Sequence, residues 1–242
     1  IDGKFDIERE ARNAETVPDD EGETSSAGDF TASYARSEVK LDQRYSTPGE
    51  SHAMMEPHAT IAAWADGKLT VWTSNQMIAW GKRDLAKALS LRPEQVRLDS
   101  PYIGGGFGGK LFLRSDVVLS ALGARAVGRP VKVVVTRPLM VNNTTHRPAT
   151  LQHIRIGASK DGHILAMSHE SISGNLPDGK PETAVQQTKL FYAGESRQVA
   201  MKLAQLDLPE GNAMRAPGEA PGLMALEIAM DEMAEKLGLD PV

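Results

Sequence analysis

Apolar and polar positions alternate in two pairs of short runs, and each pair predicts a β-hairpin. The runs are rich in β-branched and aromatic residues, and an Asp-Gly pair lies between the members of each pair. The predicted strands are residues 60–64 and 69–73, joined at Asp66-Gly67, and residues 151–156 and 164–168, joined at Asp161-Gly162. Two further strands are predicted, a short one over residues 96–98 and a buried one over residues 131–136.

Three other stretches repeat their apolar residues with the 3.6-residue period of a helix, and they cover residues 82–90, 111–127 and 222–237. Gly128 and Pro130 are expected to end the second helix, and Gly238 is expected to end the third in the left-handed conformation. The apolar stripe of the last helix consists of Leu223, Leu226, Met230, Met233 and Leu237.

This mixture of hairpins, single strands and helices predicts an α/β or α+β fold with mixed sheets and packed helices. Residues 1–30 are polar and include the acidic run Asp19–Glu23, so we expect a linker or surface arm there. Residues 31–242 are expected to form the first part of one domain that is incomplete at its C-terminal end.

Composition excludes several classes of function. The 242 residues carry a net charge of −5, whereas a nucleic-acid-binding protein normally shows a basic face. The chain has no cysteine, so it can hold neither a disulfide nor a cysteine-ligated iron–sulfur cluster of its own. No apolar run approaches the roughly 20 residues that a membrane-spanning helix needs. We therefore expect neither a nucleic-acid partner nor membrane insertion.

One segment demands a specific explanation, because five of the six positions from 104 to 109 are glycine. Each glycine disfavours folding by roughly 0.5–1 kcal/mol relative to alanine, about 3–5 kcal/mol for the group. A plain turn needs only one or two glycines. Backbone without Cβ atoms can approach a ligand closely and aim its N–H groups at an anionic or oxo group.

Three ordinary explanations of this segment compete. Gly104, Gly106 and Gly109 match the dinucleotide pattern G-x-G-x-x-G, but Arg129 stands where that fold carries an acidic residue. Gly104 to Lys110 nearly match a P-loop, but Leu111 follows where Ser or Thr must bind Mg²⁺. A glycine-rich bend that packs a helix on a sheet is the third possibility.

A resemblance to a known family favours a fourth explanation. The segment Tyr102–Lys110 resembles the molybdenum-site loop of the xanthine oxidase and aldehyde oxidase family of molybdenum hydroxylases. Three other segments resemble the family in its own order: residues 49–62, the polar turn 73–76, and residues 214–218 with the helix that follows them. The resemblance runs from about residue 40 to the end of the sequence. Within the family it is strongest to the molybdenum-binding large subunit of bacterial aldehyde oxidases.

The resemblance implies roles for individual residues. The residues implied to contact the cofactor are Gly105, Gly106, Phe107, Gly108, Ser74, Asn75 and Ala216. Phe107, Leu111, Arg215 and Pro217 are implied to line the substrate pocket. Arg215 is the implied catalytic residue, because its guanidinium would stabilise negative charge that develops on oxygen. The pterin holds the metal in this family, so no side chain of this chain is expected to ligate it.

The sequence departs from the family at two of these positions. Members that oxidise purines have a glutamate where this chain has Leu111, so an aldehyde is the implied substrate. Ser74 stands where many members place a glutamine beside a molybdenum oxygen, and Ser74, Asn75 and Gln76 are all candidates to replace it.

The resemblance also implies cofactors and partners beyond this chain. The implied cofactor is a molybdenum–pterin, with the cytosine dinucleotide form as one candidate, and electrons would pass to [2Fe–2S] and FAD centres on two partner subunits of a heterotrimer. The family's general-base glutamate lies in a later segment that nothing here matches, so the chain without the rest of its subunit is expected to be inactive. The compartment is open between cytoplasm and periplasm, and the resemblance favours the periplasm.

Two hypotheses of other classes stay open. One is a nucleotide- or phosphate-binding module built on the glycine segment, and the other is a structural half-domain without a ligand of its own.

Overall fold

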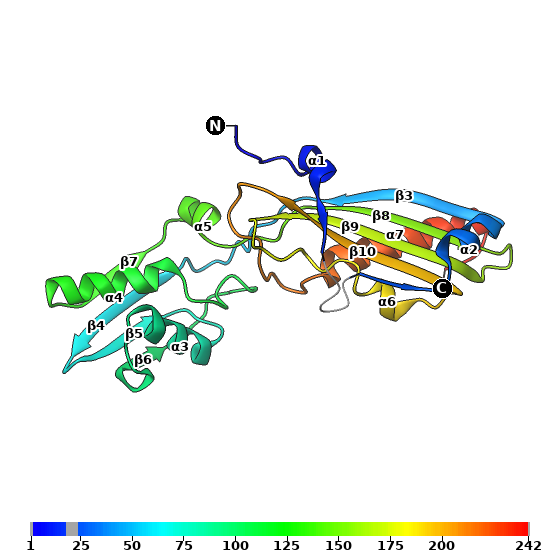
Figure 1. The fold of residues 1–242 in the computed structure, drawn as a ribbon. Coiled ribbons are helices and arrows are strands. Elements are labelled where there is room, and N and C mark those ends of the chain that lie inside the picture. The colour runs from blue at the N-terminus through cyan, green and yellow to red at the C-terminus, as the bar shows by residue number, and fades with distance from the viewer. Residues whose placement is uncertain (1, 18–23, 242) are drawn as a thin grey trace. The chain divides into compact units, whose positions relative to one another are not determined.

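The computed structural model describes residues 2–17 and 24–241, and the chain divides into two compact units (Figure 1). Unit 1 consists of Ile1–Glu50 and Arg147–Val242, and unit 2 consists of Ser51–His146. Unit 2 is therefore inserted between two parts of unit 1. The acidic run that we expected to belong to a polar arm, Asp19–Glu23, lies outside the described residues.

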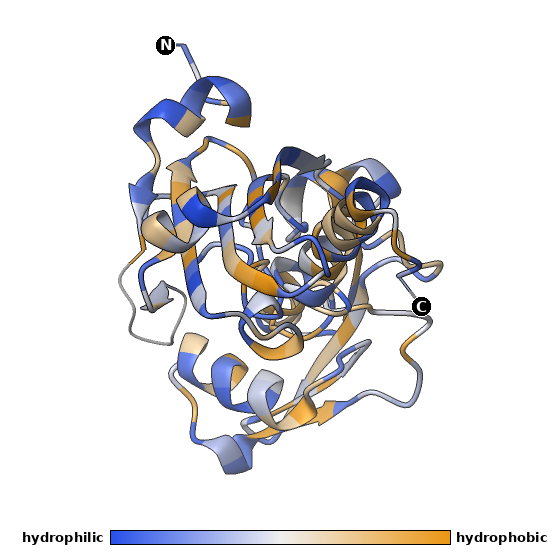
Figure 2. Cartoon of the chain, turned by 90° about the vertical axis from the view of Figure 1, so that its right-hand side faces the viewer, coloured by the Kyte–Doolittle hydropathy of each residue, from blue (hydrophilic) through white to orange (hydrophobic). Residues whose placement is uncertain are grey.

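Unit 1 is built on one mixed sheet. Its strand order is β1 (Glu15–Thr16), β10 (Ser196–Gln205), β9 (Ile164–Asn175), β8 (Thr150–Ala158) and β3 (Val39–Thr47), and β2 (Ser25–Ala27) also pairs with β10. Strands β8 and β9 form the predicted antiparallel hairpin, and β3 pairs antiparallel with β8. Hydrophobic and hydrophilic segments are mixed throughout the chain in Figure 2. The buried apolar residues of this sheet include Leu41, Ile154 and Met167.

The pairing of β9 with β10 is parallel, so the chain must cross from one end of the sheet to the other between them. Residues 176–195 make this crossover and contain the short helix α6 (Thr188–Phe191). The crossover also carries Glu182 and Thr188, two buried polar residues that matter below.

Helix α7 (Glu219–Leu237) covers one face of this sheet. Its buried residues Leu226 and Met233 pack with Leu41, Ile154 and Met167 of the strands. Gly238 ends the helix in the left-handed conformation, as predicted. Three short helices complete the described part of unit 1: α1 (Ile7–Glu10), η1 (Ala11–Asn13) and α2 (Phe30–Arg36).

Unit 2 has its own sheet and its own core. The strand order is β6 (Val96–Asp99), β5 (Lys68–Thr73), β4 (Ala59–Ala65) and β7 (Val131–Val134). Its helices are α3 (Ile78–Ala88), η2 (Pro93–Gln95), α4 (Ser115–Val127) and α5 (Arg137–Asn143). Leu85 of α3 and Ala121 of α4 are buried in one cluster with Leu69 and Val71 of β5.

Both predicted hairpins and the mixed fold class are confirmed. Several predicted bounds are wrong. The first helix, predicted over residues 82–90, is α3 over Ile78–Ala88, and the third, predicted from residue 222, begins at Glu219. The second helix begins at Ser115 rather than 111, because residues 106–111 form turns and the backbone of Arg114 is extended. The strand that we expected to be buried over 131–136 ends at Val134, and its residues alternate in exposure because β7 is an edge strand.

The polar N-terminal segment contributes two short strands, since β1 and β2 both pair with β10. Its described residues are otherwise largely exposed, and Asp29 caps α2 by accepting the Ala32 N–H. Among the described residues, none of the helices has the length and apolar character needed to cross a bilayer.

Candidate functional site

The glycine segment of unit 2 forms a loop with repeated left-handed backbone. Gly104, Gly105 and Gly108 have φ values of 61°, 88° and 102°, and Phe107 has a φ of 51°. A bulky residue with positive φ is uncommon and persists only where its surroundings hold it. The Phe107 side chain is 43% exposed, so burial of the ring does not explain this conformation.

Gln76 holds the second half of the loop. Its Oε1 accepts the N–H groups of Gly108 and Lys110 at 3.1 and 3.2 Å, and its own N–H donates to the Lys110 carbonyl at 2.8 Å. A Cβ atom at Gly106 would fall 2.6 Å from Gln76 Cδ, well inside van der Waals contact. A Cβ atom at 106 would therefore displace the Gln76 side chain from its hydrogen bonds to Gly108 and Lys110.

Lys110 holds the loop from inside. The residue is 1% exposed, and its Nζ donates to the Ile103 carbonyl at 2.5 Å, which ties the two ends of the loop together. Glu56 Oε2 lies 3.9 Å from the same Nζ. Burial lowers the pKa of Lys110, while Glu56 and Asp116 act in the opposite direction.

The carbonyl of Gly109 also points into unit 2. Arg114 Nε donates to it at 3.1 Å, and His58 Nε2 lies 3.3 Å from it. Burial lowers the pKa of His58, which favours the neutral ring. The second half of the loop is thus fixed by the side chains of Lys110, Arg114 and His58.

The N–H groups in the first part of the loop have no partner within the unit. The described residues offer no hydrogen-bond acceptor to the N–H groups of Gly105, Gly106 and Phe107, whereas the N–H groups from Gly108 to Leu111 are all engaged. Three successive donors therefore remain for a ligand. Such a row of backbone N–H groups suits an anionic or oxo group.

The structure separates the three polar candidates of the turn 74–76. Asn75 is buried, and its Oδ1 accepts the Met77 N–H at 2.9 Å at the start of α3. The Ser74 side chain is half-buried and makes no hydrogen bond with the described residues. Gln76 is the residue of this turn whose side chain contacts the glycine loop. The sequence named it as a candidate but gave no signal that singled it out.

Leu111, the predicted pocket residue that follows the glycine loop, is half-buried directly after Lys110. Its assignment to the substrate pocket stays a prediction.

The second predicted loop, residues 214–218, lies in unit 1 directly before α7. Ala216 has a φ of 56° and Gly218 a φ of 76°, and Arg215, Ala216 and Pro217 are exposed. The Arg215 side chain makes no hydrogen bond or ion pair within the described part of the chain. Its guanidinium is available to a ligand.

Backbone strain concentrates in the segments that carry the family resemblance. Five described non-glycine residues have positive φ, and Asp66 and Ser90 of these lie in ordinary turns. The other three are Ala53, Phe107 and Ala216, one in each of three resembling segments. Strained residues of this kind cluster at ligand sites.

Comparison with known proteins identifies the family. The sequence model described as the molybdopterin cofactor-binding domain matches residues 12–242. The chain belongs to the molybdopterin cofactor-binding domain family. Its resemblance to the xanthine oxidase and aldehyde oxidase family is thereby confirmed.

Relatives of the chain within this family range from high to low sequence identity. The chain is 62% identical over 240 residues to the aldehyde oxidoreductase molybdenum-binding subunit PaoC of Escherichia coli K12, covering 99% of this chain and 33% of that protein. It is 29% identical over 221 residues to the nicotinate dehydrogenase large molybdopterin subunit of Eubacterium barkeri, covering 89% of this chain and 52% of that protein. The chain spans about a third of the length of its relatives at 62–63% identity.

Solved structures share the fold. Quinoline 2-oxidoreductase from Pseudomonas putida 86 superposes with a TM-score of 0.87 at 22% identity, over 100% of this chain and 33% of that one. Aldehyde oxidoreductase from Desulfovibrio gigas superposes with a TM-score of 0.83 at 23% identity, over 100% of this chain and 28% of that one. At these identities the likeness establishes the fold alone.

The glycine loop fits a molybdenum–pterin group in this family. The unengaged N–H groups of Gly105, Gly106 and Phe107 are donors for oxygen atoms. The space that Cβ atoms would fill at Gly104, Gly105 and Gly106 is taken by Glu56, Met54 and Gln76, so these glycines allow close packing of the loop within the unit. In the described residues, no three His, Cys, Asp or Glu side chains form a group suited to a metal ion.

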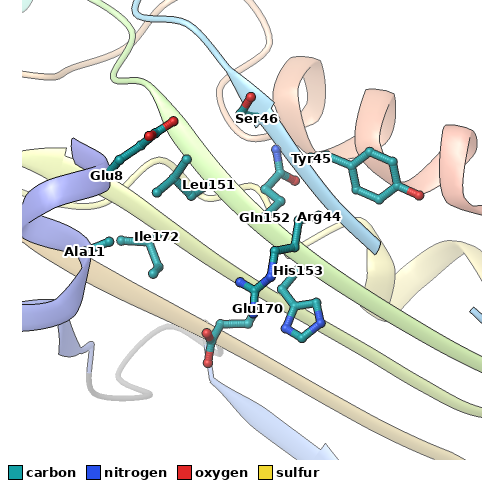
Figure 3. Close-up of a pocket in the computed structure, with 10 residues that line it drawn as sticks. All are labelled: Glu8, Ala11, Arg44, Tyr45, Ser46, Leu151, Gln152, His153, Glu170 and Ile172. Carbon is teal, nitrogen blue, oxygen red and sulfur yellow. The ribbon is translucent and has the colours of Figure 1, made fainter. Parts of the chain in front are cut away.

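A separate cavity of about 410 Å³ lies on the sheet of unit 1, beside α1 (Figure 3). Two of its charged residues are already paired, because Glu170 contacts Lys202 at 2.7 Å and His153 contacts Asp42 at 2.6 Å. In Figure 3, Tyr45 points away from this cavity, and its hydroxyl donates to Glu232 of α7 at 2.8 Å. None of the predicted site residues lines this cavity.

Proposed function

We propose that the chain forms part of a molybdenum-cofactor-dependent oxidoreductase that converts aldehydes to carboxylic acids with oxygen from water. The observation that carries the proposal is the row of unengaged N–H groups at Gly105, Gly106 and Phe107, in a loop of the molybdopterin cofactor-binding domain family. The relatives at 62–63% identity bear the name aldehyde oxidoreductase, which supports an aldehyde as substrate.

When bound, the molybdenum–pterin group would supply the two-electron oxidation and the addition of oxygen. The residues of this chain would hold the cofactor and orient the substrate. The glycine loop would donate hydrogen bonds through the N–H groups of Gly105, Gly106 and Phe107, and the unpaired Ser74 hydroxyl would add a further contact. Gln76 would keep the loop in the binding conformation, since it engages the two N–H groups that follow the free row.

For the substrate, Phe107 and Leu111 of unit 2 would present apolar side chains that exclude water. Leu111 offers no hydrogen bond to a purine ring, which favours an aldehyde. Arg215 would stabilise negative charge on the aldehyde oxygen, because a guanidinium provides fixed donors with a permanent charge.

The proposal extends to partners and location. A relative named as a subunit has other subunits, and by the family resemblance we propose an iron–sulfur subunit and an FAD subunit in a heterotrimer. We further propose the cytosine dinucleotide form of the pterin and a periplasmic location on the same resemblance. The chain without the rest of the molybdenum subunit is expected to be inactive, since nothing in it matches the family's general-base glutamate.

The rival nucleotide-binding hypothesis fits the geometry less well. In a P-loop the lysine reaches the phosphates and the loop runs into a helix N-terminus. Here Lys110 Nζ is bound to the Ile103 carbonyl in the interior of unit 2, and α4 begins only at Ser115. Saturable, Mg²⁺-dependent ATP binding by the chain would nevertheless favour this rival.

The test compares two variants of the whole protein, produced in a host that makes the cofactor. Gly106→Ala is expected to lose most bound molybdenum, because its Cβ would collide with Gln76. Arg215→Ala is expected to keep its molybdenum and to lose at least 10-fold in aldehyde turnover. Absence of molybdenum from the wild-type protein, by elemental analysis, would end the proposal, and unchanged turnover would remove Arg215 from the site.

A further inference from the structure

The backbone of the loop 214–218 has an unfavourable conformation. Ala216 and Gly218 both have positive φ, on either side of Pro217. This conformation is unfavourable for a residue with a Cβ atom, such as Ala216. The loop therefore needs support from outside, and the structure contains such support at both of its ends.

Arg147 supports the first end. Its guanidinium Nη2 donates to the carbonyls of Met214, at 3.1 Å, and Arg215. The side chain is 5% exposed, and its Nε lies 3.9 Å from Glu50 Oε2. The backbone of Arg147 is fixed as well, because it exchanges two hydrogen bonds with Glu50 at 3.0 and 2.9 Å.

Glu182 supports the second end. This residue is 6% exposed, and its Oε1 accepts the Gly218 N–H at 2.6 Å. Its own N–H donates to the buried Ser173 hydroxyl of β9 at 2.9 Å. A Cβ atom at Gly218 would fall 2.6 Å from the Thr183 carbonyl oxygen, so the crossover segment lies directly against the loop.

Two buried groups of opposite charge thus hold one exposed loop. Burial raises the pKa of Glu182, whereas the Gly218 N–H and the Arg147 charge lower it. Desolvating two charges costs several kcal/mol, and apolar residues of similar size often stabilise a fold equally well. Stability alone is a weak reason for this arrangement, while a fixed backbone geometry at Arg215 is a strong one.

We propose that Arg147 and Glu182 are positioning residues that fix the loop 214–218 and thereby aim the Arg215 side chain at the substrate. The inference rests on the proposed function of Arg215. The Arg215 side chain has no partner in the described residues, so the backbone, which fixes the direction of its Cα–Cβ bond, is what the fold can use to aim it. Arg147 binds the carbonyl of that residue directly.

The first experiment measures steady-state aldehyde oxidation by the holoenzyme. Arg147→Met is expected to lower kcat at least 10-fold with KM changed less than 3-fold and molybdenum content unchanged. The double variant Arg147→Met/Arg215→Ala is expected to be no slower than Arg215→Ala alone, because Arg147 acts through Arg215. Multiplicative losses in the double variant would overturn the positioning role.

Conservative and control variants sharpen this result. Glu182→Gln keeps an oxygen for the Gly218 N–H and is expected to stay within 3-fold of wild-type kcat, whereas Glu182→Ala is expected to lose at least 10-fold. Arg197→Met is the matched control, since Arg197 Nη1 donates to the Lys189 carbonyl at 2.7 Å in the same unit. It is expected to leave kcat unchanged.

The second experiment does not depend on activity. Hydrogen exchange at the amides of residues 212–220 is expected to be at least 10-fold faster in Arg147→Met and Glu182→Ala than in wild type and Arg197→Met. Unchanged exchange would overturn the inference. Faster exchange together with an Arg215→Ala variant of full activity would refute the proposed role of Arg215, and with it the aiming, while leaving the support of the loop established. If Arg147→Met does not fold, Arg147→Lys replaces it in both experiments with the same expectations.

Discussion

The side chain of Gln76 is the point at which the binding loop of unit 2 can be tested most directly. Its Oε1 accepts two N–H groups of the loop, and the half-buried Ser74 two residues earlier accepts none from the described residues. Gln76→Ala would leave the Gly108 and Lys110 N–H groups without their acceptor, at a cost of roughly 1–3 kcal/mol each where they stay buried.

We therefore expect Gln76→Ala to lower the molybdenum content of the whole protein at least 5-fold. Ser74→Ala is the matched control and is expected to stay within 2-fold of wild type. Elemental analysis of the purified variants measures both. A larger loss for Ser74→Ala than for Gln76→Ala would show that Ser74 makes the more important cofactor contact.

At the scale of residues, the sequence predicts the glycine loop well and its supports poorly. Five glycines in six positions mark the loop in the sequence, because each glycine disfavours folding relative to alanine and a plain turn needs only one or two. The supports depend on where distant side chains meet. Nothing in the sequence indicates that Lys110 is buried or that Arg147 binds the carbonyl of a residue 68 positions away.

At the scale of elements, the contact between α7 and the crossover segment gives a prediction of unusual sign. Gly→Ala inside a helix normally stabilises by up to about 1 kcal/mol. At Gly222 a Cβ atom would fall 2.8 Å from the Ala184 carbonyl carbon and closer still to its oxygen, and backbone cannot move aside cheaply. Gly222→Ala is expected to destabilise unit 1 by about 1–3 kcal/mol, as overpacking does.

Urea unfolding of the chain measures this effect. The matched control is Gly123→Ala in α4, where the nearest atom to the new Cβ would be a Val131 methyl carbon at 3.3 Å. A side chain can shift by a few tenths of an ångström, so this variant is expected to stay within about 0.5 kcal/mol of wild type. Equal effects at both positions would contradict the proposed close contact at Gly222.

A buried histidine links three elements of unit 1 and makes its stability depend on pH. His169 of β9 lies 2.6 Å from the Thr188 hydroxyl of α6 and 2.9 Å from Gln152 Oε1 of β8. Burial lowers the pKa of His169 to about 3. In the unfolded chain the ring takes up a proton near pH 6.5, whereas in the folded chain it stays neutral until far lower pH.

The unfolded state thus binds more protons below pH 6.5, and acid weakens the fold. The free energy of unfolding is expected to fall by at most about 5 kcal/mol between pH 6.5 and 3 from this residue. Urea unfolding at several pH values measures the slope, and His169→Gln is expected to reduce it. Parallel pH curves for wild type and variant would refute this role of His169.

The elements themselves were largely predictable from local pattern. Both hairpins follow from alternation around Asp-Gly turns, and α7 follows from its apolar stripe and Gly238. The parallel pairing of β9 with β10 was not predictable, because no local signal marks a crossover of irregular chain. The start of α3 was predicted four residues late and that of α4 four residues early, because the helical period does not show which flanking residues form turns.

At the scale of the whole molecule, unit 2 is an insertion whose two flanking residues pair through their backbones. Glu50 and Arg147 form an antiparallel pair that exchanges both backbone hydrogen bonds, in register with the Thr47–Thr150 pair of β3 and β8. Such a pair can be joined by a two-residue turn. We expect a chain in which Asn-Gly replaces residues 51–146 to fold as unit 1 alone, with one cooperative thermal transition in circular dichroism.

The control for this deletion carries the same Asn-Gly replacement together with Gly222→Ala. It is expected to melt at a lower temperature, because the α7 contact lies entirely within unit 1. A deletion protein without a cooperative transition would mean that unit 1 requires unit 2 to fold.

The insertion also fixes an order of events while the protein is being made. Ribosomes release the chain from its N-terminus, and every residue of unit 2 emerges before β8 does. Unit 2 can therefore finish folding before β8, the partner of the nine-residue strand β3, has been synthesised. An unpaired strand of this length is a template for pairing with other chains. Translation that slows between residues 47 and 150 would prolong this exposure, so we expect slower synthesis across unit 2 to increase the fraction of the protein that aggregates.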